Sequence, residues 1–249
     1  SQVRTMSTPP AGNQATLVGM LEASTALSEA SDLPTLLHRI LRISRELTAS
    51  DAGSIYLLEQ SGNDPDGGQI WFAAFQNASL EAKHRHHPGR GEEGAPDPAR
   101  SLEQELLDGR LPLTTESLVG WSALTGQSLA IADVYGLDPQ APYHFDASID
   151  QHLGYRAVSM LTVPMRCPSG EILGVLQLIN RLRPEEGGPL TPADARERTL
   201  PYDGFDQRLI EALASQAAVC VERKKLIDSQ TRLIEAILTL LARAVDAKS

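Results

Sequence analysis

Residues 157–180 read AVSMLTVPMRCPSGEILGVLQLIN, and this stretch decides the fold. Its two apolar segments, 157–166 and 171–180, flank the sequence CPSG, in which Pro, Ser and Gly favour a tight turn. The stretch therefore predicts two antiparallel strands that form a hairpin. An antiparallel sheet can leave one face free for a ligand while helices cover the other face.

A second hairpin is predicted nearer the N-terminus. The segments AGSIYLLE at 52–59 and QIWFAAFQN at 69–77 are strand-like and flank SGNDPDGG, a strong turn signal. Ahead of them, Ser31 and Asp32 are N-cap candidates for a helix that carries Pro34 in its first turn and ends near Ser50. An earlier helix is predicted from the helical spacing of Leu17, Met20, Leu21, Ala23 and Leu27.

Short elements and loops are predicted between and after the hairpins. Residues 77–110 are rich in charge, Gly and Pro, so we expect a surface insertion, and residues 77–100 should be flexible and dispensable for stability. A short helix over 116–126 should end at Gly126, a strand should follow at 128–135, and a second short helix should span 145–155. Residues 183–202 are expected to form another exposed loop.

The C-terminal part is predicted to be one helical region from Phe205 onward. Its first half has an apolar face that suits burial on the sheet. Beyond the charged sequence ERKK at 222–225, a four-three apolar alternation is typical of a two-stranded coiled coil, and it involves Leu226, Gln230, Leu233, Ile237, Leu240 and Ala244. We therefore expect residues 226–249 to be a signalling helix and the chain to form a homodimer through its N- and C-terminal helices. The alternative is that this tail packs back on its own domain.

Charge and composition exclude several classes of partner. The net charge of −10 and the sequence pI near 5.1 disfavour nucleic acid and anionic lipid as partners. The chain has no apolar stretch long enough to span a bilayer, and Cys167 and Cys220 have no metal-ligand spacing, so we expect a cytoplasmic protein. Residues precede Met6 and the last helix stops abruptly, which suggests that part of the natural protein is missing.

A series of spaced motifs resembles GAF domains, most closely those of cyclic-nucleotide phosphodiesterases and adenylyl cyclases. The motifs are GWSA at 120–123, TGQ at 125–127, IADVY at 131–135, FD at 145–146, GYR at 154–156, VPM at 163–165, GVLQL at 174–178 and NR at 180–181. The resemblance covers roughly residues 17–225. It implies an α+β fold with a central antiparallel sheet, helices on one face and a ligand pocket on the other. The expected organisation is a flexible arm at 1–15, a GAF domain at 16–225 and the signalling helix.

A ligand site is predicted between the sheet and the two short helices. Backbone amides at Gly120, Trp121, Ser122 and Ala123 would suit a phosphate, because the first amides of a helix have no partner within it. The other predicted contacts are Phe75, Asp146, Asp150 and Gln177. Asp146 and Asp150 either share a helix face toward a base or face solvent, and Phe75 and Trp121 either stack on a planar ligand or belong to the core. The ligand is expected to be a small molecule, with a nucleotide as one candidate.

Departures from the family pattern limit the choice of ligand. Cyclic-nucleotide-binding members carry a lysine after the asparagine and an acidic pair after a phenylalanine, whereas this chain has Arg181, Leu209 and Ile210. The affinity for cyclic AMP or cyclic GMP should therefore be weak or absent. The alternative functions are a ligand-free dimerisation scaffold and a thiol reductase on the same fold. We assign no catalytic residue to this fragment. We also assign no metal, because a solvated basic loop explains the cluster of His84, His86 and His87.

The tail gives a second resemblance. Residues 231–249, TRLIEAILTLLARAVDAKS, are similar to the helix that opens the HD-GYP phosphodiesterase domain of bacterial cyclic di-GMP signalling proteins. The resemblance implies that the full-length protein is a metal-dependent phosphohydrolase and that this chain is its regulatory part.

Overall fold

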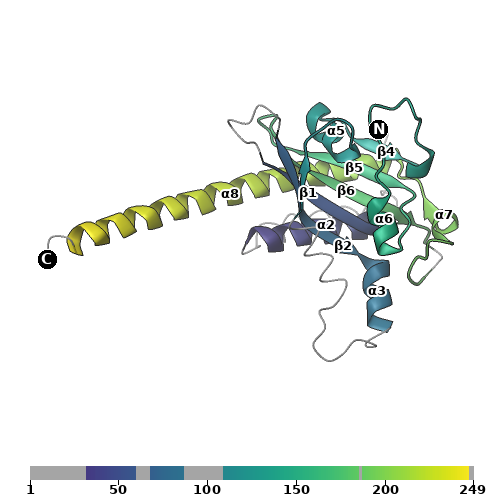
Figure 1. The fold of residues 1–249 in the computed structure, drawn as a ribbon, viewed down its shortest axis with the longest axis horizontal. Coiled ribbons are helices and arrows are strands. Elements are labelled where there is room, and N and C mark those ends of the chain that lie inside the picture. Colours follow the sequence, from purple (N-terminus) through teal and green to yellow (C-terminus); the bar gives the residue numbers. More distant parts are fainter. Residues whose placement is uncertain (1–31, 60–67, 87–108, 185–186, 247–249) are drawn as a thin grey trace, which may run out of the picture.

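The computed structural model describes residues 32–59, 68–86, 109–184 and 187–246. These residues form one antiparallel sheet in the strand order β3-β2-β1-β6-β5-β4, and β7 pairs with β6 (Figure 1). The strands are β1 Ser50–Glu59, β2 Gln69–Asn77, β3 Arg110–Pro112, β4 Leu129–Ile131, β5 Met160–Arg166, β6 Ile172–Leu182 and β7 Thr199–Leu200. The predicted α+β fold with a central antiparallel sheet is confirmed.

Both predicted hairpins are present. In the β5–β6 turn the amide of Cys167 donates to the Glu171 carbonyl oxygen at 2.8 Å, and Gly170 has φ +92°, a value that favours glycine. In the β1–β2 hairpin the register shifts between Ile55 and Tyr56, so that strand β2 contains one extra residue.

Two helices cover one face of the sheet. Helix α2, Leu33–Thr48, begins at Asp32, whose carboxylate accepts a hydrogen bond from the Thr35 amide at 2.8 Å. Helix α8, Gly204–Asp246, packs on β5 and β6, while α2 packs on β1 and β2 and also contacts α8. Buried Leu, Ile, Val and Ala side chains from both helices and these strands form the main core. The apolar spacing read from the sequence thus predicts which face each helix buries.

The opposite face of the sheet is covered by shorter elements. They are α5, Leu118–Thr125, the 3-10 helix η1, Val134–Gly136, and α6, Ser148–Leu153. The two predicted short helices are therefore confirmed. They pack in two smaller apolar clusters on this face of the sheet.

The segment expected to be an insertion is ordered at its beginning. Helix α3, Ala78–His86, follows β2 directly, and Ser79 and Leu80 are buried. The Ser79 hydroxyl donates to the Asp51 carboxylate at 2.7 Å and accepts from the Leu190 amide at 2.6 Å. The expectation of a dispensable segment from residue 77 is therefore wrong for 77–80, because a polar residue in a charged sequence can still be a buried hydrogen-bonding group. Residues 87–108 lie outside the described part of the chain.

The second expected loop also contains structure. Helix α7, Ala195–Arg198, and strand β7 lie within residues 183–202. The Arg198 guanidinium donates to the carbonyl oxygens of Gly187, Gly188 and Pro189 at 2.9 to 3.1 Å. A single arginine with several donors thus holds this turn beside the buried side chains of Leu190 and Ala195.

Helix α8 continues far beyond the domain (Figure 1). Val221 is its last buried residue in the stretch whose side chains are described, and the apolar residues after it are exposed. No described helix is long and apolar enough to cross a membrane. The predicted arm at 1–15 and the predicted helix over 17–27 fall outside the described residues.

Candidate ligand-binding site

The face beneath α5 and α6 carries a row of side chains across four strands. Ser54 on β1 pairs with Phe75 on one side and with Gln177 on the other, and Gln177 pairs in turn with Thr162 on β5. Ser54, Gln177 and Thr162 are buried, while Phe75 is half-buried. Strand alternation therefore places both predicted sheet residues, Phe75 and Gln177, in the same row.

Gln177 is held by hydrogen bonds on both sides. Its Oε1 accepts from the Tyr56 hydroxyl at 3.4 Å, and its Nε2 donates to Thr162 Oγ1 at 3.2 Å. Burial raises the pKa of Tyr56 well above its usual value, so the phenol stays protonated and donates. These bonds fix the side-chain amide, whose NH2 group is a donor and whose oxygen is an acceptor.

Aromatic side chains fill the neighbouring space below α5. The rings of Tyr56 and Phe72 lie 4.4 Å apart between centroids. They pack in one cluster with Val119, Ala123 and Val175. Ala123 therefore faces the sheet as predicted, but it meets Tyr56 and Phe72 rather than open space.

The start of α5 differs from the arrangement that we expected. Ser117 is the N-cap, and its hydroxyl oxygen accepts from the Gly120 amide at 2.9 Å. The Trp121 amide donates to the Ser117 carbonyl oxygen at 2.8 Å. The expectation of free amides at Gly120 and Trp121 is wrong, because a serine cap and the first turn of the helix use them.

Trp121 and Ser122 point away from the aromatic cluster. The Trp121 ring makes an edge contact with Tyr143 at 5.2 Å between centroids and packs beside Leu118 and Met160. The Ser122 hydroxyl is buried and donates to the Gln127 carbonyl oxygen at 2.9 Å. Both residues fix α5 in place. Trp121 therefore packs as a core residue, which was the alternative to stacking on a planar ligand.

The two aspartates of the α6 region do not share a face. Asp146 is exposed and accepts from the Ser148 amide at 2.9 Å, just before the helix. Asp150 is buried, and its Oδ2 accepts from the Tyr135 hydroxyl and the Ala157 amide, each at 2.8 Å. Burial raises the pKa of Asp150, and burial together with Asp150 raises that of Tyr135 to about 12. Asp150 thus ties α6 to its neighbours.

A buried polar network that the sequence pattern did not predict lies at the start of β1. The Asp51 carboxylate accepts from the Tyr155 hydroxyl at 2.8 Å, and Asn180 donates to the same hydroxyl at 2.9 Å. Asn180 also accepts from the Val158 amide at 2.7 Å and has φ +59°, which asparagine tolerates. The signal that could have located this network was Asp51, a charged residue directly before the apolar strand segment at 52–59.

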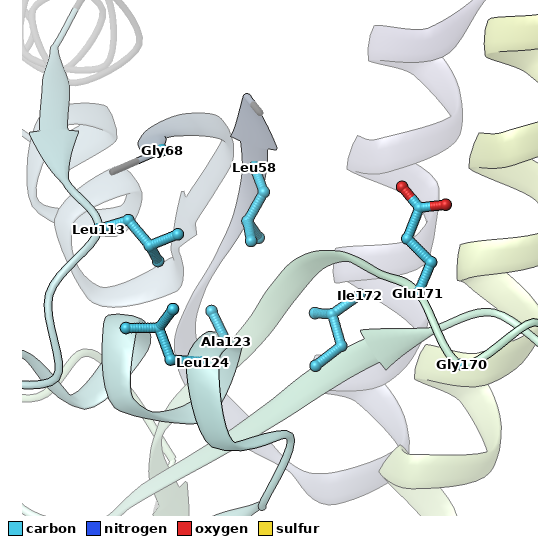
Figure 2. A pocket seen from close by; sticks show the side chains of 8 residues that line it. All are labelled: Leu58, Gly68, Leu113, Ala123, Leu124, Gly170, Glu171 and Ile172. Carbon is cyan, nitrogen blue, oxygen red and sulfur yellow. The ribbon is translucent and has the colours of Figure 1, made fainter. Parts of the chain in front are cut away.

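A hollow of about 400 Å³ lies at the other end of this face (Figure 2). It opens between the end of β1, the end of α5 and the β5–β6 turn. The residues around it are Leu58, Gly68, Leu113, Ala123, Leu124, Gly170, Glu171 and Ile172. Of the eight predicted site residues, it includes Ala123 alone, so this hollow is separate from the row with Phe75 and Gln177.

Polar contacts join this side of the sheet to α8 and to Asp203, the residue before it. The Ser128 hydroxyl, in the turn after α5, donates to Glu211 at 2.7 Å. Arg181, at the end of β6, pairs with Asp206 at 3.1 Å and with Asp203 at 3.5 Å. The acidic partners of Arg181 are thus Asp203 and Asp206, which precede Leu209 and Ile210, the positions where the family pattern has its acidic pair.

Both cysteines lie on the helix-covered face. Cys167 belongs to the main core and Cys220 packs against it from α8. Burial and the nearby Glu222 raise the pKa of Cys167 to about 11, and burial also raises that of Cys220. In the described part of the chain no group of three or more His, Cys, Asp or Glu side chains could hold a metal ion. The His84, His86 and His87 side chains are outside that part.

A single antiparallel sheet with α2 and α8 on one face and short covering helices on the other defines an α+β domain. The GAF domain family model matches residues 32–221. Since the match covers most of the chain, this chain belongs to the GAF domain family, whose members are typically sensory or regulatory domains.

Two curated relatives are phosphodiesterases. The chain is 27% identical over 159 residues to dual 3',5'-cyclic-AMP and -GMP phosphodiesterase 11 of Drosophila melanogaster, covering 62% of this chain and 9% of that protein. It is 24% identical over 228 residues to phosphodiesterase 11A of Takifugu rubripes, covering 91% of this chain and 21% of that protein. The chain therefore spans a small part of the length of either relative.

Solved structures of low sequence identity share the fold. The GAF domain of a phosphoenolpyruvate-protein phosphotransferase from Coxiella burnetii has a TM-score of 0.58 at 16% identity, covering 88% of this chain and 99% of that one. Free methionine-R-sulfoxide reductase from Neisseria meningitidis, in complex with its substrate, has a TM-score of 0.53 at 14% identity, covering 91% and 99%.

Proposed function

We propose that this chain is a regulatory module that binds a small molecule beneath α5 and α6 and transmits its binding state through α8. One observation carries the proposal: α8 is a continuous helix whose first part packs on β5 and β6 and whose second part leaves the domain. A change in the sheet or in its covering helices therefore acts on the same rigid element that reaches the output region. Free cysteines support action in the cytoplasm.

The ligand is proposed to lie against the row of Phe75, Ser54 and Gln177. Phe75 offers a half-buried ring, and Gln177 offers an oriented amide that can exchange its bond to Tyr56 or Thr162 for one to a ligand. Asp150 contributes by holding α6 over this row, since its Oδ2 is already engaged.

Native mass spectrometry of protein purified from cells tests this site. A ligand should appear as added mass on the chain, and Gln177→Leu should remove it because the amide is lost. The matched control is Gln140→Leu, which changes an exposed loop residue. Equal loss of the ligand in both variants, or retention in both, would contradict the assignment.

Cyclic AMP and cyclic GMP, named for the two relatives, are expected to bind weakly or not at all. The amides of Gly120 and Trp121 that would receive a phosphate are engaged by Ser117. Calorimetry with both nucleotides measures this directly, and micromolar binding of either one would overturn the expectation.

A ligand-free dimerisation scaffold is the second candidate. It is favoured by the contact of Tyr56 with Phe72 in front of Ala123, which fills the space expected for a ligand. Protein that carries no added mass in native spectra, yet remains dimeric, would favour this candidate. A thiol reductase is not favoured, because burial keeps Cys167 protonated; reductase activity that Cys167→Ser abolishes would reverse this conclusion.

The homodimer is proposed to form along the exposed part of α8. Leu233, Ile237 and Leu240 are 48 to 66% exposed, and pairing with a second copy would bury them. The double variant Leu233→Glu and Ile237→Glu should be monomeric in sedimentation. The control Arg232→Glu and Thr239→Glu, on the polar side of the same helix, should stay dimeric; a dimer in both cases would refute pairing here.

The output domain is proposed to be a cyclic di-GMP phosphodiesterase of the HD-GYP type. The support is the resemblance of residues 231–249 to the opening helix of that domain. Phosphodiesterase activity of the full-length protein toward cyclic di-GMP tests the proposal, and activity confined to other substrates would contradict it.

A further inference from the structure

The short connection between α5 and β4 is held by side chains on both sides. Helix α5 ends at its cap residue Gly126, and strand β4 begins at Leu129. The Ser122 hydroxyl donates to the Gln127 carbonyl oxygen at 2.9 Å, and the Arg166 guanidinium donates to the Gly126 carbonyl oxygen at 2.8 Å. Because the connection is short and bonded in this way, it moves together with the helix before it and the strand after it.

The row of side chains beneath α5 and α6 ends beside this connection. Gln177 Nε2 donates to Thr162 Oγ1 at 3.2 Å, and Thr162 on β5 pairs with Leu129, the first residue of β4. Leu129 is buried in one apolar cluster with Leu118 of α5. A change at Gln177 or in α5 therefore acts on the same short segment, the start of β4.

Ser128 extends from this segment to the helix on the opposite face of the sheet. Its hydroxyl, directly before β4, donates to Glu211 Oε1 of α8 at 2.7 Å, a short bond to a carboxylate. Both residues are half-buried, so water competes for this bond less than it would at an exposed pair. Strand β4 is at the edge of the sheet, and a side chain beside it can reach around to α8. Ser128 thus connects the face beneath α5 directly with α8.

Glu211 has a second donor, which makes its bond to Ser128 easier to release. Gln207, one turn earlier on α8, donates from Nε2 to the same Oε1 at 2.9 Å. When Ser128 withdraws, the carboxylate keeps this partner, so the release avoids the large cost of leaving a partly buried acceptor without a donor. The contact can therefore exist in two states, bonded and released, that differ modestly in free energy.

We propose that Ser128 is the positioning residue that passes the state of this row to α8, by making or releasing its bond to Glu211. The inference rests on the proposed function, since it names the contact that transmits ligand binding. Arg181 has a different role, because two carboxylates and a carbonyl oxygen hold it at once. The loss of one of these bonds leaves the arginine in place, so it anchors the start of α8.

The two cysteines of the chain allow the contact to be tested without an added label. Cys220 is half-buried on α8 and packs against the main core, so its alkylation rate reports how α8 lies on the sheet. Cys167 is buried in the same core, so its rate reports opening of the whole domain. Both rates are measured in one sample with iodoacetamide and peptide mass spectrometry.

Gln177→Leu and Ser128→Ala, alone and combined, form a double-mutant cycle in the full chain. Each single change should raise the Cys220 rate about threefold or more, because each favours the released state, while the Cys167 rate changes less. The double variant should match Ser128→Ala alone, since a bond already lost cannot be released again. Ser128→Thr keeps the hydroxyl and should restore the response to Gln177→Leu. The control Ser148→Ala, at an exposed serine of α6, should leave that response unchanged.

Effects that multiply in the double variant would overturn the inference, because the two residues would then act independently. A Cys220 rate that Gln177→Leu does not change, or a rise matched by an equal rise at Cys167, would overturn it as well. Native mass spectra of the same samples separate this inference from the proposed function. Ligand mass on Ser128→Ala together with independent effects would refute Ser128 as the contact and leave the ligand site in place. The absence of ligand mass from every chain would refute the proposed function and the inference with it.

Discussion

Gly120 determines how closely α5 approaches the preceding chain. A Cβ atom at this position would lie 2.0 Å from the Thr114 carbonyl oxygen, far inside van der Waals contact. Gly120→Ala must therefore shift the backbone and should lower the free energy of unfolding by about 1–3 kcal/mol. The control Gly136→Ala has no atom nearer than 3.8 Å and should have little effect. Thermal denaturation of both variants checks the prediction, and equal stability would contradict it.

Tyr155 connects two buried groups that would otherwise lose a partner. Its hydroxyl donates to Asp51 and accepts from Asn180. Tyr155→Phe should therefore cost about 1–3 kcal/mol, since it leaves buried polar atoms without that bond. Tyr143→Phe is the control, because Tyr143 contacts Trp121 through its ring. Urea denaturation should separate the two variants; a Tyr143→Phe effect as large as that of Tyr155→Phe would refute the argument.

Cys167 should react slowly with alkylating reagents. With a pKa of about 11, roughly one thiol in a thousand is ionised at pH 8. The folded state holds this proton more tightly than the unfolded state, so the stability that it contributes is complete below pH 9 and is lost as the pH rises toward 11. Iodoacetamide at pH 8 should modify half-buried Cys220 first, as mass mapping would show. Faster modification of Cys167 would indicate an activated thiol.

At the residue scale the sequence predicts less of the site than of the fold. Strand alternation places Phe75 and Gln177 on one face, and the motif at 120–123 locates α5. The partners of each polar group depend on tertiary contacts, so Ser117 capping, the Tyr135 bond of Asp150 and the aromatic filling beside Ala123 could not be read from spacing.

Among the elements, the segment before β7 depends on Arg198. Arg198→Lys keeps the charge but cannot direct several donors to the carbonyl oxygens of Gly187, Gly188 and Pro189. The variant should lose about 1 kcal/mol of stability and be cleaved faster by protease near residues 187–190. Arg223→Lys, an exposed change on α8, is the control. Unchanged cleavage would show that other contacts order this segment.

The hairpins and long helices were predictable because hydrophobic periodicity and turn residues act locally. Asp32, Gly126 and the CPSG turn indicate their elements correctly. Helix α3 and the segment of α7 and β7 were predicted to be loops, since their order comes from single buried groups such as Ser79 and Leu190 rather than from a repeated apolar pattern.

For the whole molecule, helix content should depend on protein concentration. The exposed part of α8 has no packing partner in one copy, and helices in proteins owe most of their stability to packing of an apolar face. Dilution should therefore reduce the far-UV helix signal while Trp fluorescence, which reports the domain through Trp71 and Trp121, stays constant. A helix signal that does not change down to nanomolar concentration would mean either a very tight dimer or a self-sufficient helix, and sedimentation at the same concentration decides between them.

Val221 acts mechanically as the fulcrum of a lever. From Val221 to Asp246 the helix continues for 25 residues (246 − 221), which is about 38 Å at about 1.5 Å per residue. A tilt of only about 5° at the fulcrum moves the far end by about 3 Å, the size of a hydrogen bond made or broken. A motion of the sheet that is too small to reorganise the core would therefore still change the atomic contacts made by the C-terminal end of α8.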